Sequence, residues 1–351
     1  MAPDENDVVG GEVANIHDVA REAGVSIKTV SRVLNGEPNV RPKTKAAVEA
    51  AIDALNYVPS HFARAMKSGQ SKTIAFLTDS VVTSPESIDI AKGVAEAAAE
   101  SGLALFFLAS EPDKSPFEGP NFDFIRSVQV DGLIFATHSH REIEVPEHLL
   151  EQPLVLVNCF EFAGRVSSVV PDDRQGGYLA GQLLLEKGHE NIAFLNLPKD
   201  VVAAGLRQQG LNLAYERAGL EAPACVFLKH EAADGYTEDL ANQVKRIMCG
   251  PNPPTALFCG NDKTALRALG ALKQLGIRVP EDVSLLGYDD FTIIAELLSP
   301  SLTTIAIPYL EMGREAISVL QDVIEKHAQN QIRQPAKIQI PGWPVHRKTV
   351  I

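Results

Sequence analysis

The sequence predicts an α/β protein with a small helical module near the N-terminus and a larger body of two parallel sheets covered by helices. Between residues 16 and 56, apolar residues recur at three- and four-residue spacing, which is typical of packed helices. From residue 73 onward, short apolar runs alternate with longer amphipathic stretches, which is the pattern of strand–helix–strand units. The length of 351 residues leaves room for two such lobes after the helical module.

Residues 16–35 predict two short helices joined by a tight turn. The first has one apolar face, formed by Ile16, Val19, Ala20 and Ala23. Gly24 can adopt the positive φ that reverses the chain, and Ser26 can cap the second helix by accepting a hydrogen bond from a free N–H group. Two helices arranged in this way can place the second one in the DNA major groove.

The second helix of this pair has a cationic outward face. Lys28, Arg32 and Asn35 share that face, and Ser31 lies beside them. Hydrogen-bond donors and positive charge are what a helix needs to read base edges. An ordinary amphipathic pair with a solvated face is the structural alternative.

A third helix and a short basic segment follow. Val48, Ile52 and Leu55 give residues 46–56 an apolar face that can pack on the first two helices, and Pro59 ends this helix. Residues 60–69 are short, basic and weakly amphipathic, and they precede the first strand-like run.

Together these segments resemble the LacI/GalR family of bacterial transcription regulators. The matching motifs are IHDVA and AGVS within residues 16–26, TVSRVLN at 29–35, LNY with a nearby proline at 55–59, and ARAMK at 63–67. The resemblance implies a helix-turn-helix DNA-binding domain over 14–58 and a hinge helix with its linker over 59–71. It also implies a repressor whose affinity for a near-palindromic operator is controlled by a small molecule.

The resemblance assigns DNA contacts to particular residues. On the recognition helix these are Ser26, Ile27, Lys28 and Arg32 for the major groove, Thr29 and Ser31 for phosphates or base edges, and Asn35 on the same face. In the hinge, Met66 stands where the family usually has a leucine wedge for the minor groove, with Lys67 beside it, and Phe62 and Ala63 would meet their symmetry mates in a homodimer. Because the hinge is too short to be stable alone, we expect it to order only on DNA.

The charge is distributed unevenly along the chain, whose formal net charge is −13. Residues 1–13 carry four acidic and no basic residues, which predicts a disordered acidic tail. Residues 14–72 carry nine basic and five acidic residues. A basic module therefore precedes an acidic body, and phosphate contacts from this module should make DNA binding depend strongly on salt.

The body alternates predicted strands and helices in two successive sets. Strands are expected over 73–78, 103–109, 132–137, 153–158, 192–197, 225–229, 255–259 and 283–287, and a further run over 301–305. Helices are expected over 90–101, 122–128, 174–187, 206–218, 238–248, 263–275 and 309–327. The resemblance implies two doubly wound lobes of the periplasmic-binding-protein type, the first over 72–170 plus 305–332 and the second over 171–304 plus 333–351.

An effector site is expected between the two lobes, beyond the carboxyl ends of the strands. Asp172, Asn261 and Asp289 follow predicted strands, and Arg207 lies in the first turn of a predicted helix. Carboxylates, an amide and a guanidinium suit directed hydrogen bonds to the vicinal hydroxyls of a mono- or oligosaccharide. The resemblance supports the same four residues, and Ser84 is a further candidate for the pocket.

Structural roles are the alternative for these residues and their neighbours. Asp173, Asp262 and Asp290 could be caps or turn residues, and Arg207 could join the lobes as an ion pair. In the loop after the first strand, Pro85 precedes a glutamate where the family often has an aromatic residue. An aromatic side chain that could stack on a sugar or a base is therefore missing there, which leaves the identity of the effector open. A purine or another co-repressor is the alternative to a sugar.

Other function classes have little support in the sequence. Enzyme motifs, catalytic residues, metal-ligand spacing and cofactor motifs are not found, and the four cysteines show no ligand or disulfide spacing, which suits a reducing cytoplasm. No apolar stretch is long enough to cross a membrane. A transporter's solute-binding protein is a competing interpretation, disfavoured because no signal peptide is found, and an enzyme on a doubly wound fold is another. No leucine heptads follow the body, so we expect a dimer.

Overall fold

The computed structural model describes residues 14–34, 36–57, 71–79, 85–110, 115–229, 238–331 and 334–351. The chain forms two compact units, residues 1–71 and residues 72–351, which we call the head and the body. Some expectations fall outside the described residues: the acidic tail, the hinge with Phe62, Ala63, Met66 and Lys67, and the single residues Asn35 and Ser84.

Within residues 14–34 and 36–57, the head forms the helices α1 (Ile16–Glu22), α2 (Ile27–Leu34) and α3 (Pro42–Ala54). They enclose a small apolar core made of Val19, Ala20, Val30, Val48 and Ala51. The third helix begins four residues earlier than expected, because proline is favoured in the first turn of a helix, where its missing N–H group is not needed.

The turn between α1 and α2 has the local features that its sequence predicts. Gly24 adopts a φ of +61°, which favours glycine. The Ser26 Oγ accepts a hydrogen bond from the Thr29 N–H group at 3.2 Å, so Ser26 caps α2 as expected. At the other end of the motif, Asn15 and Asp18 form a reciprocal capping box at the start of α1.

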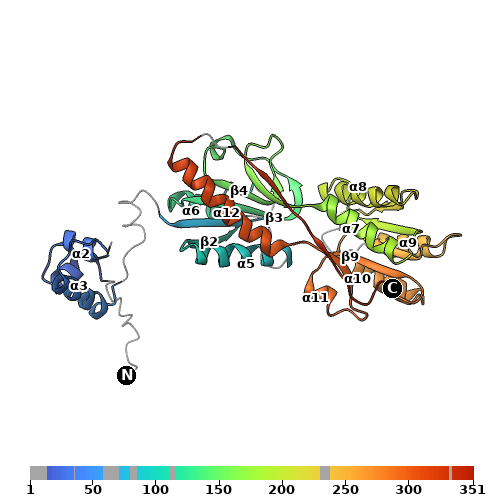
Figure 1. Cartoon of the computed structure of the whole chain (residues 1–351), viewed down its shortest axis with the longest axis horizontal. Coiled ribbons are helices and arrows are strands. Elements are labelled where there is room, and N and C mark those ends of the chain that lie inside the picture. The colour runs from blue at the N-terminus through green and yellow to red at the C-terminus, as the bar shows by residue number, and fades with distance from the viewer. Residues whose placement is uncertain are drawn as a thin grey trace, which may run out of the picture. The chain divides into compact units, whose positions relative to one another are not determined.

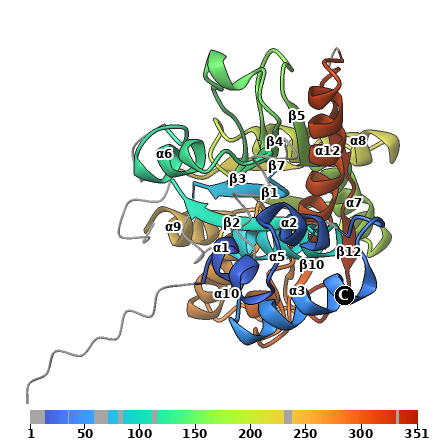
Figure 2. The same ribbon diagram turned by 90° about the vertical axis from the view of Figure 1, so that its left-hand side faces the viewer.

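The first lobe of the body contains a six-stranded parallel sheet in the order β11-β5-β4-β3-β1-β2. Its strands are β1 (Thr73–Thr78), β2 (Ala104–Ala109), β3 (Gly132–Glu142), β4 (Leu154–Phe160), β5 (Ser167–Pro171) and β11 (Lys337–Ile340). Its helices are α5 (Pro85–Glu100), α6 (Pro120–Ser127), the 3-10 helix η1 (Glu147–Leu149) and α12 (Tyr309–Ala328). α12 packs on β3, β4 and β5 and beside α5 (Figures 1 and 2).

The second lobe contains a six-stranded sheet in the order β12-β10-β9-β8-β6-β7, parallel except for β12. Its strands are β6 (Ile192–Asn196), β7 (Ala224–Phe227), β8 (Ala256–Cys259), β9 (Ser284–Asp289), β10 (Thr303–Ala306) and β12 (Trp343–Val345). Its helices are α7 (Asp173–Glu186), α8 (Val202–Arg217), α9 (Glu238–Met248), α10 (Asp262–Gln274) and α11 (Thr292–Ala295). The predicted pair of doubly wound lobes is confirmed.

The last crossings between the lobes differ from the expectation. β11 pairs with β5 in the first sheet, so the chain enters the second sheet after residue 340 and not at 333. β10 pairs with β9, so residues 305 and 306 belong to the second sheet and not to the first lobe. β11 carries no continuous apolar run, because it is an edge strand whose side chains are exposed or half-buried in alternation.

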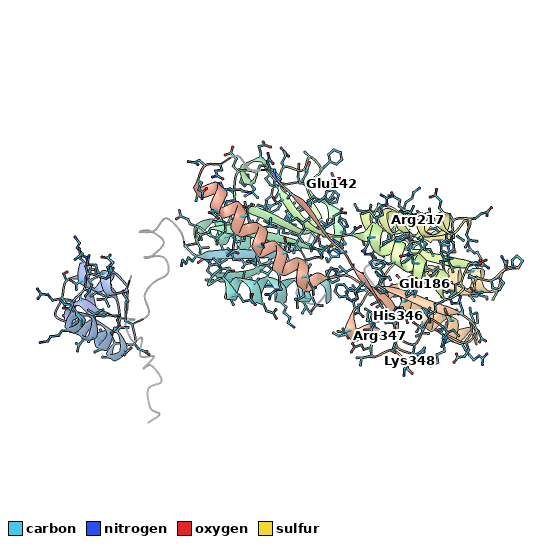
Figure 3. The ribbon with its side chains drawn as sticks, viewed as in Figure 1. Glu142, Glu186, Arg217, His346, Arg347 and Lys348 are labelled. Atoms are coloured by element: carbon cyan, nitrogen blue, oxygen red, sulfur yellow. The ribbon has the colours of Figure 1, made fainter. Side chains whose placement is uncertain are left out.

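Helices α7 and α8 approach each other closely because glycines line their contact. A methyl group added at Gly177 would overlap the carbonyl of Arg207, and one at Gly210 would overlap the carbonyl of Arg174. Arg217, the last residue of α8 (Figure 3), donates a hydrogen bond to the Tyr178 hydroxyl of α7 at 3.0 Å. This close packing fixes where α8 places Arg207 in the second lobe.

A buried carboxylate holds three elements of the second lobe together. Asp262, in the first turn of α10, accepts hydrogen bonds from the Thr304 hydroxyl of β10 at 2.7 Å and from the Phe291 N–H group before α11 at 2.9 Å. Burial raises the pKa of Asp262 to about 7, although these two hydrogen bonds act in the opposite direction. Asp262 is therefore a structural residue, as its alternative interpretation had it.

We predict that Gly177→Ala destabilises the body. The added methyl group has to push α8 away from α7, and overpacking of this kind costs about 1–3 kcal/mol. Gly205→Ala is the matched control, because Gly205 lies in α8 with no atom within 4 Å of an added Cβ. The control should be more stable than the wild type by about 0.5–1 kcal/mol. Urea unfolding of both variants measures the difference, and equal stabilities would contradict the close contact.

We also predict that Asp262 makes the stability of the body depend on pH. Its pKa of about 7 in the folded protein lies above its ordinary value of 3.8, so the folded state binds the proton more tightly than the unfolded chain. The resulting stability is present below about pH 4 and is lost as the pH rises through about 7, with a slope of at most about 1.4 kcal/mol per pH unit.

Asp262→Asn cannot ionise, so this variant should lack that part of the pH dependence. Urea unfolding of the wild type and the variant across this pH range tests the prediction. Two parallel stability profiles would mean that Asp262 ionises at its ordinary pKa.

Candidate functional site

The first candidate site is the outward face of α2 in the head. Ser26, Ile27, Lys28 and Arg32 are exposed, and Thr29 and Ser31 are half-buried. The hydroxyl groups of Ser26 and Thr29 lie 2.9 Å apart, and the Arg32 Nε lies 3.4 Å from a carboxylate oxygen of Glu37. The helix therefore presents the Lys28 ammonium group, the Arg32 guanidinium and hydroxyl groups on one accessible face, as the sequence predicts.

The second candidate site is a buried cluster of charges around Arg207 in the body. The Arg207 Nε donates a hydrogen bond to Asp173 Oδ1 at 2.7 Å, and another of its N–H groups donates to the carbonyl of Gly260. Its third nitrogen lies 3.8 Å from Asp289 Oδ1. The guanidinium also stacks on the Tyr288 ring, 3.6 Å from the ring centroid.

The opposite charges in this cluster keep one another ionised. Burial would raise the pKa of Asp173, but the charge of Arg207 and a hydrogen bond from His140 outweigh burial and lower it. Burial would likewise lower the pKa of Arg207, yet Asp173 and the neighbouring Tyr288 and Asp289 raise it. The guanidinium and the carboxylate therefore both remain charged. Their mutual attraction offsets the free-energy cost of removing both charges from water.

His140 brings the first lobe into the cluster. It lies in the last part of β3, and its Nδ1 is 2.7 Å from Asp173 Oδ2. Beyond Ala136 the pairing of β3 with β4 shifts register, so the strand continues irregularly past its expected end at Thr137. Because of this extension, His140 reaches Asp173 in the second lobe. No periodic signal in the sequence marks it.

The structure places the sequence-predicted effector residues in two groups. Arg207 and Asp289 are buried and close to each other. Asp172 and Asn261 cap α7 and α10, where they accept hydrogen bonds from the Gln175 and Thr264 N–H groups at 2.9 and 2.8 Å. Asn261 and Asp289 lie at the strand ends of the second sheet and Arg207 lies on α8, whereas Asp172 directly follows β5 of the first sheet and begins α7.

The structure also shows what Asp173, Arg207 and Asp290 contact, the residues for which structural roles were the alternative. Asp173 is not a cap but the shared partner of Arg207 and His140. Arg207 pairs with Asp173 of its own lobe, and within this cluster His140 is the residue that reaches across from the first lobe. Asp290 has a φ of +59° and forms an ion pair with Arg347, 2.7 Å away in the C-terminal segment (Figure 3). Because α8 begins at residue 202, Arg207 lies in its second turn.

Within the described ranges, no group of three or more histidine, cysteine or acidic side chains is arranged to hold a metal ion. No helix in these ranges is both long enough and apolar enough to span a bilayer. The four cysteines are all free thiols.

Two family models match the chain. Residues 15–60 match the bacterial regulatory proteins of the lacI family, and residues 167–350 match the periplasmic binding protein-like domain.

Curated relatives match nearly the whole chain. The sucrose operon repressor of Escherichia coli is 35% identical over 87% of this chain and 92% of its own length. The ribose operon repressor of Escherichia coli K12 is 36% identical over 88% and 92%. The HTH-type transcriptional repressor PurR of Haemophilus influenzae Rd is 34% identical over 96% and 99%.

Solved structures of similar proteins also match nearly the whole chain. The lac repressor dimer bound to operator and an anti-inducer has a TM-score of 0.76 and 26% identity over 96% of this chain and 99% of its own. The complex of the transcriptional regulator CelR with cellobiose has a TM-score of 0.63 and 28% identity, and it also covers 96% of this chain and 99% of its own. Since the relatives match both the head and the body, this chain belongs to the LacI family of bacterial DNA-binding transcription repressors.

Proposed function

We propose that the protein represses transcription as a homodimer on a near-palindromic operator, and that a sugar bound between the lobes controls its operator affinity. The observation that carries the effector part is the convergence of the buried Arg207 and Asp289 beside the strand ends of the second lobe. The names of the sucrose and ribose operon repressors and the cellobiose complex support a sugar as the ligand class.

DNA reading is assigned to α2. Its exposed Lys28 and Arg32 provide donors for base edges, and the half-buried Thr29 and Ser31 lie near enough to the surface for phosphate contacts. Asn35, Met66 and Lys67 keep their proposed DNA contacts, and Phe62 and Ala63 their proposed contact between hinges, from the family resemblance alone. The operator complex of the lac repressor dimer supports a dimer that binds two half-sites.

The effector contacts are assigned by chemistry. Arg207 has N–H groups for hydroxyl oxygens, and Asp289 has a carboxylate for hydroxyl protons, so together they suit a pair of vicinal hydroxyls. Asp172 and Asn261, which cap α7 and α10, are proposed as further contacts, with Ser84 from the first lobe. A purine is the second candidate, favoured by the PurR relative that covers 96% of the chain.

The dimer contact has a candidate surface on the second lobe. The side chains of Ile293 and Leu297, on and just after α11, are 68% and 78% exposed. Large apolar side chains with this exposure are typical of protein contacts when they cluster. We infer that the protein acts in the cytoplasm, where operator DNA is, and that it is not an enzyme, because its named relatives are repressors.

We predict that Arg32→Ala removes base discrimination. A bidentate contact of arginine with a guanine is worth about 1–3 kcal/mol of specificity, so the ratio of operator to random-DNA affinity should fall by roughly fivefold to 150-fold. Fluorescence anisotropy measures this ratio on an operator selected from a random library by the wild type. Arg21→Ala is the control, since Arg21 is an exposed α1 arginine paired with Asp18, and it should keep the wild-type ratio. An unchanged ratio in Arg32→Ala would refute the assignment of α2.

We predict that Asp289→Ala abolishes the effector response and leaves operator binding without effector unchanged. Loss of hydrogen bonds to a charged group costs about 1.5–3 kcal/mol, so the effector should bind at least tenfold more weakly. Calorimetry with sucrose, ribose, cellobiose, adenine, guanine and hypoxanthine identifies the ligand of the wild type and then tests the variant.

Asp322→Ala is the control, because Asp322 is an exposed carboxylate on α12 that pairs with Lys326. If the Asp289 variant binds the ligand as tightly as the wild type does, the proposed site is wrong.

A further inference from the structure

The carboxylate of Asp173 is shared between the two lobes. Arg207, from the same lobe, occupies Oδ1 at 2.7 Å, and His140, from the first lobe, occupies Oδ2 at 2.7 Å. The side chains of Asp173, His140 and Arg207 are 0%, 2% and 5% exposed. Water therefore cannot substitute for either partner, and movement of one partner changes the environment of the other.

The histidine ring is held in place from its own lobe. The Phe160 ring at the end of β4 contacts it edge-on, with 5.6 Å between the ring centroids. The nearby Thr137 hydroxyl lies 2.9 Å from both the Ser139 and the Asn158 carbonyl oxygens, which share its one proton. A rigid end of β3 thus carries His140, so its contact with Asp173 reports where the first lobe stands relative to the second.

The chemistry of the contact defines the roles of the two ring nitrogens. Because the Asp173 carboxylate only accepts hydrogen bonds, Nδ1 carries the proton and donates it. Nε2 is buried and has no hydrogen-bond partner among the described residues. A buried ring nitrogen without a partner is unusual in a packed interior, and a ligand with hydroxyl groups can supply one.

We propose that His140 is the positioning residue that the first lobe contributes to the effector site. By holding one oxygen of Asp173 it sets the orientation of the carboxylate, and through the other oxygen it sets Arg207. The approach of the two lobes and the orientation of the effector-binding guanidinium are then coupled, because the His140–Asp173 contact takes part in both. This proposal rests on the proposed effector role of Arg207, but its physical core, the dependence of Arg207 on His140, can be measured without any ligand.

The test uses the full-length protein with His140→Asn, His140→Leu and His138→Ala. Asparagine retains a donor near the position of Nδ1, whereas leucine fills space without one. His138 is the matched control, because it lies two residues earlier in β3, is half exposed, and contacts Asp79 of its own lobe at 3.2 Å. Thermal unfolding confirms that each variant is folded.

The first readout is the ¹⁵N–¹H signal of the Arg207 Nε–H group, recorded without ligand and assigned with Arg207→Lys. We expect this signal to be protected from exchange with water in the wild type, in His138→Ala and in His140→Asn, and to shift and lose protection in His140→Leu. An unchanged signal in His140→Leu overturns the proposal, as does the same loss in His140→Asn, because packing alone would then explain the residue.

The second readout is the release of operator by whichever of sucrose, ribose and cellobiose acts on the wild type. His140→Leu should need at least tenfold more sugar for half-maximal release, and His140→Asn should stay near the wild type. If none of these sugars acts on the wild type, the sugar part of the proposed function fails. The Arg207 signal still decides the role of His140 in that case.

Discussion

The body of this protein depends on the burial of one guanidinium. A charge removed from water is tolerated only when its partners are close and well oriented, and Arg207 obtains them from Asp173, the Gly260 carbonyl and Asp289. These partners lie on α7, after β8 and at the end of β9, so the ion pair requires three strand-to-helix connections to meet at one point. The glycines between α7 and α8 follow from the same requirement, since α8 has to lie close enough for the Arg207 side chain to reach Asp173.

Local sequence predicts the head well because its signals are local. The positive φ of Gly24 and the cap by Ser26 depend on neighbours a few residues away, and the structure has both. Most strands and helices of the body were also predictable, since each is long or strongly apolar. Helix starts were less so: α5, α8 and α3 begin four or five residues before the expected starts, because the ends of helices are the part that a periodic pattern locates least well.

The site was only partly predictable, for a physical reason. Asp289 could be expected near the edge of the sheet because polar residues at the ends of apolar strands meet at one edge of a parallel sheet, and Arg207 was expected near it on a neighbouring helix. Asp173 sits beside Asp172, and sequence alone does not tell which carboxylate caps the helix and which is buried, because that choice depends on the distant Arg207. His140 lies beyond a register shift in β3, and β11 is an edge strand whose place is set only by its pairing with β5. Both are consequences of tertiary structure.

The geometry around Arg207 also explains why an arginine, and not a lysine, suits this position. Its nitrogens point in three directions, toward Asp173, toward the Gly260 carbonyl and toward Asp289, and its flat face covers the Tyr288 ring. An ammonium group is a single point charge that cannot span these partners or stack in the same way. Under the function proposed above, a ligand that bonds to this guanidinium bonds to the partner of Asp173, the carboxylate that His140 of the first lobe also contacts. A ligand shifts an equilibrium only through a difference in its affinity for two states. A difference of this kind would arise if the proposed ligand bound only where His140, Asp173 and Arg207 are arranged as they are in this structure.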